Sequence, residues 1–149
     1  EIVDFDAVFG RTLRLAVDVA SSEASVRMVR EGSFGKLAAT EATALAGVLT
    51  ELVSNAVEHG LAVTGGTVTV ASERDGRDLT VTVSDDGVGI DPAAKPSGTG
   101  LGMQIVRTMV AGELRGSITW QPGVTAGTCV TVRARLGYAP PSDGEREQF

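Results

Sequence analysis

The sequence predicts an α+β fold, a two-layer α/β sandwich with helices on one face of a mostly antiparallel sheet. Two observations support this prediction. Segments with apolar residues at helical spacing are interleaved with segments in which apolar and polar residues alternate. The alternating segments also form two hairpin-like pairs with glycine-rich turns, and such pairs favour antiparallel strands over the parallel sheet of a strict βαβαβ order.

Composition sets the first limits on function. The 149 residues, 42% of them hydrophobic, suit one globular domain, and the net charge of −6 disfavours bulk contact with nucleic acid or anionic lipid. The single cysteine excludes an internal disulfide, and the single histidine excludes a multi-histidine metal site. Without an apolar run of about 18 residues or a signal peptide, we expect a cytoplasmic domain without direct membrane contact. The chain opens without methionine, which is compatible with a fragment of a longer protein.

The first helix is expected over Asp6–Ala20, followed by a short strand over Val26–Glu31. Apolar residues recur at helical spacing in the helical segment, namely Phe9, Leu13, Ala16, Val17 and Ala20. Two acidic residues, Asp4 and Asp6, suit the positive end of such a helix.

The second helix is expected from Thr40, a usable N-cap, to Gly60, a usable C-terminal glycine. A hairpin should follow, with strands over Thr67–Ala71 and Leu79–Ser84 joined by a charged turn around Gly76.

The third helix is expected over Leu101–Leu114, after a loop rich in Gly, Pro, Asp and Ser at 85–100. Its buried side should contain Ile105, Val106, Met109 and Val110. A second hairpin is expected from strands over Ser117–Gln121 and Thr128–Leu136. The tail at 139–149 has few apolar residues and is expected to be disordered, which leaves a domain over 1–138.

Three short motifs depart from the core pattern, and the first lies on the second helix. Glu51, Asn55 and His59 are spaced four residues apart and form one polar stripe. Carboxylate and amide oxygens one turn apart can hold Mg²⁺ together with its waters. The simpler interpretation of such a stripe is a solvated helix face.

The second motif, Ser84-Asp-Asp-Gly-Val-Gly-Ile90, lies at the end of a strand. A carboxylate there can accept a hydrogen bond from an exocyclic amine, and the two glycines let the backbone approach a flat ring. An ordinary Asp-Gly turn is the alternative.

The third motif, Ser97-Gly-Thr-Gly-Leu-Gly-Met103, opens the third helix. Small residues at a helix N-terminus expose N–H groups and can form an anion site. A flexible loop with a glycine-rich helix cap would have the same sequence pattern. Neither a dinucleotide-binding G-x-G-x-x-G nor a P-loop fits, since Met103 replaces the third glycine and Leu37 stands where a P-loop requires Ser or Thr.

Together, in this order, the three motifs resemble the N box and the two glycine boxes of the GHKL (Bergerat) ATP-binding fold, over about residues 1–136. That fold implies a mixed, mostly antiparallel sheet covered by about three helices. The look-alike group is the catalytic domain of bacterial sensor histidine kinases, and especially the soluble PdtaS-type kinases, in which a Glu replaces the first Asn of the N box, as Glu51 does here.

The resemblance implies ATP and Mg²⁺ as cofactors. Asn55 and Glu51 would be the metal-binding and catalytic residues, and Glu51 would orient water or metal or act as a base in slow hydrolysis. Asp85 would bind the adenine amine, with Thr128 assisting. The full nucleotide-binding set implied is Asn55, His59, Asp85, Gly87, Gly89, Ile90, Lys95, Gly98, Thr99, Gly100, Leu101, Gly102, Met103 and Thr128.

Two departures from the kinase pattern affect the expected partners. The segment from Ile90 to Ser97 is shorter than a usual ATP lid, and Lys95 within it would either reach the terminal phosphate or be simply solvated. His59 lies inside the N box, so the phospho-acceptor histidine is expected upstream or on another chain. The implied partners are ATP or ADP, an upstream dimerisation and histidine-phosphotransfer domain, and a response regulator, with no nucleic acid.

Three other functions remain open at this point. An anti-sigma factor with serine kinase activity shares the Glu-x-x-x-Asn stretch and a short lid, but its chain before the N box is mainly helical. An ATP-driven clamp needs a transducer domain after residue 136. A degenerate fold without nucleotide binding is disfavoured because the key residue types are all present.

Overall fold

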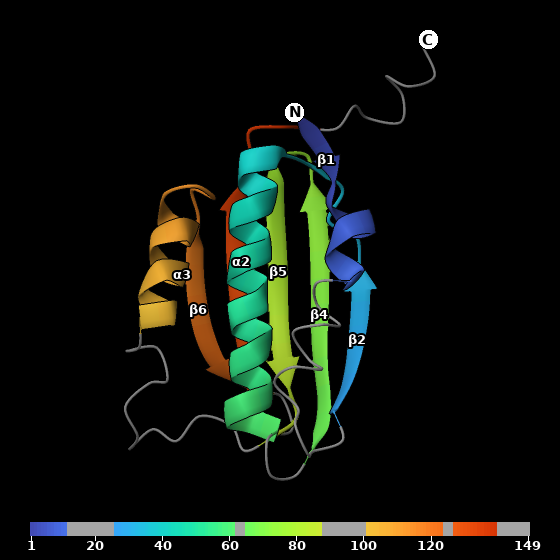
Figure 1. Cartoon of the computed structure of the whole chain (residues 1–149), viewed down its shortest axis with the longest axis vertical. Coiled ribbons are helices and arrows are strands. Elements are labelled where there is room, and N and C mark those ends of the chain that lie inside the picture. Colours follow the sequence, from blue (N-terminus) through green and yellow to red (C-terminus); the bar gives the residue numbers. More distant parts are fainter. Residues whose placement is uncertain (12–25, 62–64, 88–100, 124–126, 140–149) are drawn as a thin grey trace.

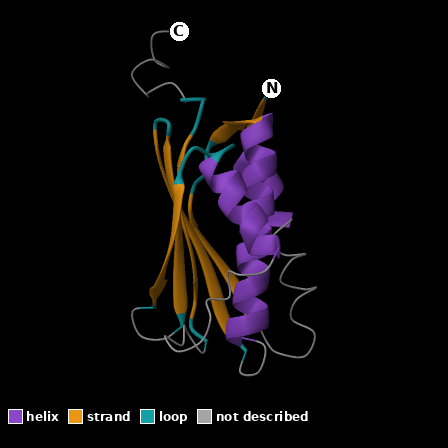
Figure 2. Ribbon diagram, turned by 90° about the vertical axis from the view of Figure 1, so that its left-hand side faces the viewer, coloured by secondary structure: helices purple, strands orange, loops and turns teal. Residues whose placement is uncertain are grey.

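The computed structural model describes residues 1–11, 26–61, 65–87, 101–123 and 127–139, with the backbone alone at 59–61. One sheet contains β2 (Val26–Gly32), β4 (Gly66–Asp75), β5 (Asp78–Asp85), β6 (Ser117–Pro122) and β7 (Thr128–Arg135). Two helices, α2 (Ala39–Asn55) and α3 (Leu101–Ala111), lie side by side against one face of that sheet (Figures 1 and 2). The predicted two-layer α+β sandwich is therefore confirmed.

The strand order is β2-β4-β5-β7-β6, and the sheet is mixed. β2 pairs with β4 in parallel, whereas every other neighbouring pair is antiparallel. A parallel pair needs a crossover connection, and α2 lies within the connection between β2 and β4. β7 enters the sheet between β5 and β6, so the two predicted hairpins join directly along β5 and β7.

The core lies between the sheet and the two helices, as strand alternation requires. The inward residues of the three central strands are Val68, Val70, Leu79, Val81, Val83, Val130, Val132 and Ala134. They belong to the same hydrophobic cluster as Leu45, Val48, Leu49, Leu52 and Val53 of α2 and Met103, Val106 and Val110 of α3. At the alternate positions, the threonines and Ser84 are half-buried, whereas charged residues such as Glu73, Arg133 and Arg135 are exposed.

A second, two-stranded sheet pairs β1 (Ile2–Asp4) with β3 (Lys36–Ala38) in antiparallel fashion. The sequence analysis did not predict it, because three-residue strands are too short to show alternation. Residues 5–11 are helical, which agrees with the start of the expected first helix, while 12–20 lie outside the described residues.

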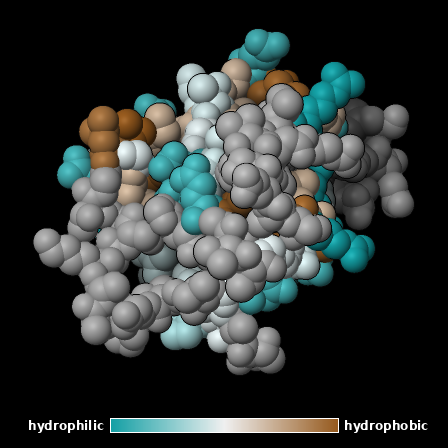
Figure 3. Space-filling model, turned by 60° about the horizontal axis from the view of Figure 1, so that its bottom comes forward, coloured by the Kyte–Doolittle hydropathy of each residue, from teal (hydrophilic) through white to brown (hydrophobic). Residues whose placement is uncertain are grey.

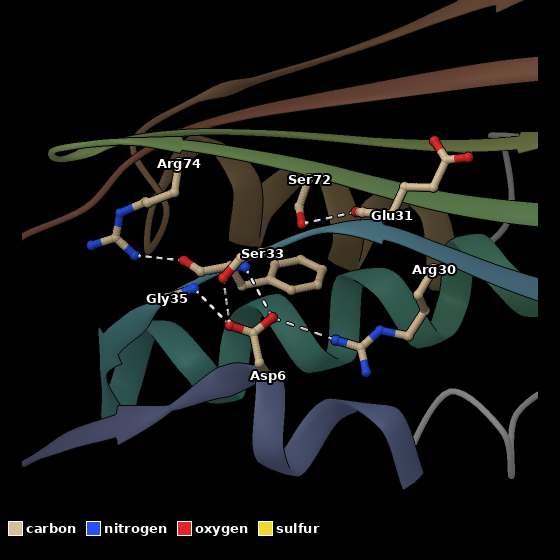
Figure 4. Close-up of polar contacts among 8 residues, drawn as sticks. Asp6, Arg30, Glu31, Ser33, Gly35, Ser72 and Arg74 are labelled. Carbon is tan, nitrogen blue, oxygen red and sulfur yellow. Dashed lines mark hydrogen bonds and ion pairs between the residues drawn. The ribbon is translucent and has the colours of Figure 1, made fainter.

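The N-terminal helical residues are fixed to the turn between β2 and β3 (Figure 4). The Asp6 carboxylate accepts hydrogen bonds from the N–H groups of Phe34 (3.0 Å) and Gly35 (2.9 Å) and from the Ser33 hydroxyl (2.9 Å). The Phe34 ring packs against two other phenylalanines, Phe5 and Phe9, at centroid distances of 4.9 and 5.4 Å. One carboxylate and an aromatic cluster therefore join segments about 28 residues apart.

A second polar cluster lies at the N-terminal end of α2. The Arg74 guanidinium donates to the carbonyls of Phe34 (2.8 Å), Lys36 (2.9 Å), Gly76 (2.7 Å) and Tyr138 (2.7 Å). Burial lowers the pKa of Arg74, and the nearby Glu41 carboxylate acts in the opposite direction.

The predicted N-cap of α2 is wrong. The helix begins at Ala39, its N-cap residue is Ala38, and no side chain caps it. Glu41, in the first turn, is buried and accepts the Gly137 N–H through both oxygens, at 3.2 and 3.0 Å. The acidic side chain that suits this helix end therefore also binds the segment after β7.

The C-terminal end of the second helix and the buried side of the third also differ from prediction, whereas α3 begins at Leu101 as expected. α2 stops at Asn55 and continues as a π-helical turn, Ala56–Leu61, where the sequence suggested α-helix to Gly60. In α3, Ile105 is 47% exposed although it was expected to be buried, and Met103 is buried in its place. The apolar stripe of α3 is thus rotated toward Met103, Val106 and Val110.

Candidate functional site

Four element ends meet at one end of the molecule. The C-terminal end of α2, the C-terminal end of β5, the first turn of α3 and the start of β7 all lie at the lower end in Figure 1, and Figure 3 views this end from below. The π-helical turn after α2 packs against β4 and β5. The topology therefore brings together the described parts of the three motifs, at 51–58, 84–87 and 101–103.

Asp85 is the last residue of β5 and the most constrained carboxylate at this end. Its side chain is buried, at 8% exposure, and accepts hydrogen bonds from the backbone N–H groups of Gly87 (3.0 Å) and Thr128. Burial raises the pKa of Asp85, the two N–H donors act to lower it, and neighbouring Asp86 raises it further. The result is a partly desolvated, oriented acceptor at the end of a strand.

Gly127 lies against Asp85 and was overlooked as a site residue, although Thr128 beside it was predicted. Its φ of +79° lies in the left-handed region. A side-chain carbon here would lie 2.8 Å from Oδ1 and 2.5 Å from the carbonyl carbon of Asp85. Only glycine lets the start of β7 approach the Asp85 carboxylate. The Ala-Gly-Thr sequence was the available signal, but it reads equally as a hairpin turn.

Asp86 has a structural role that the sequence analysis did not assign. Its carboxylate accepts the Thr67 N–H at 2.8 Å, and its own N–H donates to the Thr67 carbonyl at 3.3 Å. This reciprocal pair fixes the end of β5 to the start of β4 and holds the backbone of the second motif.

Glu51 and Asn55 are half-buried on the last turns of α2, one helical turn apart on the same side of the helix. Gly102, the second residue of α3, lies directly against the Glu51 carboxylate. Within the described residues, no three His, Cys, Asp or Glu side chains cluster so as to hold a metal ion. An amide and one carboxylate are oxygen donors that fit Mg²⁺, a cation that keeps several of its waters.

Part of the predicted set lies beyond the described residues: Gly89, Ile90, Lys95, Gly98, Thr99, Gly100 and the side chain of His59. Of the remainder, Leu101 is 74% exposed, and hydrophobic surface gathers over α3 at this end (Figure 3). The Met103 side chain packs into the core, so any nucleotide contact by Met103 falls to its backbone.

The arrangement suits a ligand with an amine-bearing ring at one end and an anion at the other. An oriented carboxylate among glycines can accept a hydrogen bond from a ring amine. The N–H groups at a helix N-terminus can bind phosphates. The family described as histidine kinase-, DNA gyrase B- and HSP90-like ATPase matches residues 40–138. The chain belongs to this ATPase family.

Curated relatives of this ATPase domain include sensor histidine kinase PdtaS from Mycobacterium tuberculosis and its counterpart from Mycolicibacterium smegmatis. Each is 42% identical over 140 residues, which cover 92% of this chain and 28% of the relative. The chain thus spans less than a third of the length of these kinases.

Solved structures similar to this ATPase domain include the histidine kinase domain of the blue-light activated histidine kinase EL346 from Erythrobacter litoralis. It is 28% identical with a TM-score of 0.77, over 90% of this chain and 62% of that one. Histidine kinase AdeS from Acinetobacter baumannii is 22% identical, with a TM-score of 0.70. The match covers 92% of this chain and 67% of the AdeS chain, and it shows that the two share a fold. In the described part of the chain, no helix is long and apolar enough to span a membrane.

Proposed function

We propose that this domain binds Mg-ATP and supplies its γ-phosphoryl group to a histidine on an upstream dimerisation and phosphotransfer domain or on a partner chain, for relay to a response regulator. The observation that carries the proposal is the buried Asp85 carboxylate, held by the Gly87 and Thr128 N–H groups and approached closely by Gly127. A cytoplasmic location, where ATP is abundant, belongs to the same proposal.

Each side chain has a distinct task in this function. Asp85 accepts a hydrogen bond from the adenine amine, and the small residues Gly87 and Gly127 keep the ring side of the site open. Asn55 and Glu51 provide oxygen ligands for Mg²⁺, which neutralises charge on the β- and γ-phosphate oxygens when bound. The first turn of α3 supplies N–H groups for the phosphates. Phosphoryl transfer requires mainly such positioning and charge neutralisation from a protein.

The anti-sigma alternative has no support from these findings. The sequence analysis separated the two functions by the segment before the N box, and β2 occupies Val26–Gly32 in that segment. The relatives described above are sensor histidine kinases, and the similar structures are histidine kinases.

Calorimetric titration with ATP, ADP and GTP in excess Mg²⁺ tests the binding step. We expect both adenine nucleotides to bind and GTP to bind far more weakly, because guanine presents a carbonyl where adenine presents an amine to Asp85. At one hundred times its dissociation constant, a nucleotide should add about 2.7 kcal/mol to the free energy of unfolding. Equal binding of GTP and ATP would contradict the role of Asp85, and binding of neither would contradict the function.

Transfer is tested with γ-labelled ATP and a fusion of this domain to a histidine kinase dimerisation and phosphotransfer domain. We expect acid-labile label on a histidine of the fusion, none on the 149-residue chain alone, and none on the fusion carrying Asn55→Ala. Acid-stable label on serine would exclude a histidine kinase.

A further inference from the structure

The absence of a side chain at Gly102 leaves room for the Glu51 carboxylate. Gly102 lies in the first turn of α3 with helical backbone geometry, so no backbone strain calls for glycine. A carbon built on it would lie 2.8 Å from Cδ of Glu51 and closer still to Oε1, below the 3.0 Å that real side-chain carbons respect. An alanine at 102 would therefore require the Glu51 carboxylate, the far end of a flexible side chain, to move from this position.

A second helical glycine shows that this crowding is specific. Gly47 lies in α2 and faces α3, yet a carbon built on it would be 3.8 Å from the Met109 sulfur, an ordinary contact. Of these two glycines in the described helices, Gly102 alone has a carboxylate where its side chain would be.

The Glu51 carboxylate consequently brings a negative charge to the N-terminal turn of α3. The first N–H groups of a helix lack partners within the helix and carry a partial positive charge. A carboxylate against this turn is electrostatically favourable in the free protein. It also occupies the region of positive potential that a phosphate chain would otherwise use.

Glu51 therefore has opposite effects on a bare and on a metal-bound nucleotide. A free triphosphate approaching α3 is repelled by the fixed carboxylate, and the protein's net charge of −6 has the same sign. A divalent cation between the phosphates and the oxygens of Glu51 and Asn55 converts that repulsion into attraction. Asn55 is four residues from Glu51 and on the same side of α2, and it carries no charge of its own.

We propose that Glu51, seated against Gly102, makes nucleotide binding conditional on Mg²⁺ by excluding metal-free nucleotide from the N-terminus of α3. The inference rests on the proposed nucleotide binding and deepens it, since it assigns the metal selectivity to one charge and one glycine. Glu51 acts here as a specificity-determining residue, whatever it contributes to transfer.

The first test compares dissociation constants for ADP and ATP in excess Mg²⁺ and in EDTA, for the parent and for Glu51→Gln. Glutamine keeps the size of the side chain and removes the charge. We expect metal-free binding to tighten about tenfold in Glu51→Gln. Binding in Mg²⁺ should change less or weaken, so that the ratio of the two constants falls.

Glu113→Gln is the matched control, because Glu113 is exposed just beyond the opposite end of α3 and its loss changes the net charge equally. It should leave both constants within twofold. Unchanged metal-free binding in Glu51→Gln, with weaker binding in Mg²⁺, would make Glu51 a metal ligand only and would overturn the proposal. Absence of nucleotide binding by the parent would instead remove the proposed function, and this inference with it.

The second test needs no nucleotide and examines the contact between Glu51 and Gly102 directly. Gly102→Ala is placed in the parent and in Glu51→Ala, and the melting temperature is measured for all four proteins. We expect Gly102→Ala to raise the melting temperature less in the parent, where the Glu51 carboxylate must move aside, than in the Glu51→Ala background, where the helix gains an alanine without that cost. Gly47→Ala should be neutral or stabilising in both, as for an unhindered helical glycine. Equal changes from Gly102→Ala in the two backgrounds would show that the glycine does not accommodate Glu51.

Discussion

We expect Asp85 to contribute more to nucleotide binding than to the stability of the fold. It is a carboxylate at 8% exposure, and burial disfavours its charged form, as its raised pKa shows. We expect Asp85→Asn to weaken adenine nucleotide binding by about 1.5–3 kcal/mol, because a charge-assisted hydrogen bond is lost. The free energy of unfolding at pH 7 should be unchanged or higher. Calorimetry and urea unfolding measure the two quantities, and Asp75→Asn, at an exposed residue at the opposite end of the β4–β5 pair, is the control.

The pKa shift of Asp85 also predicts the sign of a pH effect on stability. The folded state binds this proton more tightly than the unfolded state, so the contribution of Asp85 to the free energy of unfolding increases as pH falls. Relative to Asp85→Asn, the parent should gain stability between the raised folded-state pKa and the ordinary value of 3.8. Urea unfolding of both proteins between pH 7 and pH 4 checks this. A free energy of unfolding that falls in acid for the parent relative to Asp85→Asn would contradict the direction of the pKa shift.

The site residues that could be predicted are those whose proposed roles follow from the residues beside them in the sequence. Asp85 and Asn55 stand in motifs where the neighbouring letters indicate their task. Gly127 and Glu41 do not, because their roles arise from contacts with residues 42 and 96 positions away. The carboxylate that binds Gly137 reads in the sequence as an ordinary acid in the first turn of a helix.

Long elements with strong periodicity were predictable, and short or irregular ones were not. The strands β2, β4, β5, β6 and β7 and the helices α2 and α3 were all expected, with ends shifted by a few residues. β1 and β3 have three residues each and pair only with each other, so their signal is tertiary. The π-helical turn after Asn55 also leaves no trace in a periodicity that suits α-helix equally well.

The turn between β2 and β3 depends on one carboxylate from another element. In Figure 4 the Asp6 side chain points into this turn, where it binds two backbone N–H groups and one hydroxyl. We expect Asp6→Ala to lower the free energy of unfolding by about 2–3 kcal/mol, because two backbone donors lose their acceptor. Urea unfolding measures the loss.

Asp4→Ala is a matched control for Asp6→Ala, since Asp4 lies two residues away in β1 and its side chain is exposed. It should change stability by less than about 0.5 kcal/mol. Similar losses in the two variants would mean that the N-terminal segment matters only through its general charge.

The order of strands in the sheet could not be obtained from the sequence. Two hairpins were predicted, but their relative placement, and the position of β2 beside β4, depend on which edges meet in the folded chain. Hydrophobic alternation identifies the buried face of each strand without naming its neighbours. The parallel pairing of β2 and β4 is one of several arrangements that bury the same residues.

The segment directly after β7 should matter to the stability of the whole molecule. Leu136 is buried, the Gly137 N–H binds Glu41, and the Tyr138 carbonyl binds Arg74. We expect a chain ending at residue 135 to lose about 3–5 kcal/mol of unfolding free energy relative to the full chain, since a buried leucine and two charge-assisted hydrogen bonds are removed.

A chain ending at residue 139 is the control for that truncation and should be as stable as the full chain, as the composition of the tail predicts. Urea unfolding compares the three proteins. Equal stability of the two truncated chains would show that residues 136–138 are dispensable.

The place of β7 has a consequence for synthesis of the protein. A ribosome releases the chain from its N-terminus at about 5–20 residues per second. When β4, β5 and α2 have emerged, one edge of β5 still has no partner, because that partner is β7. The contacts made by Gly137 and Tyr138 span 96 and 64 residues and form later still. The nascent domain therefore keeps an open sheet edge and uncovered apolar residues until residues 128–138 have been synthesised and can pair with β5.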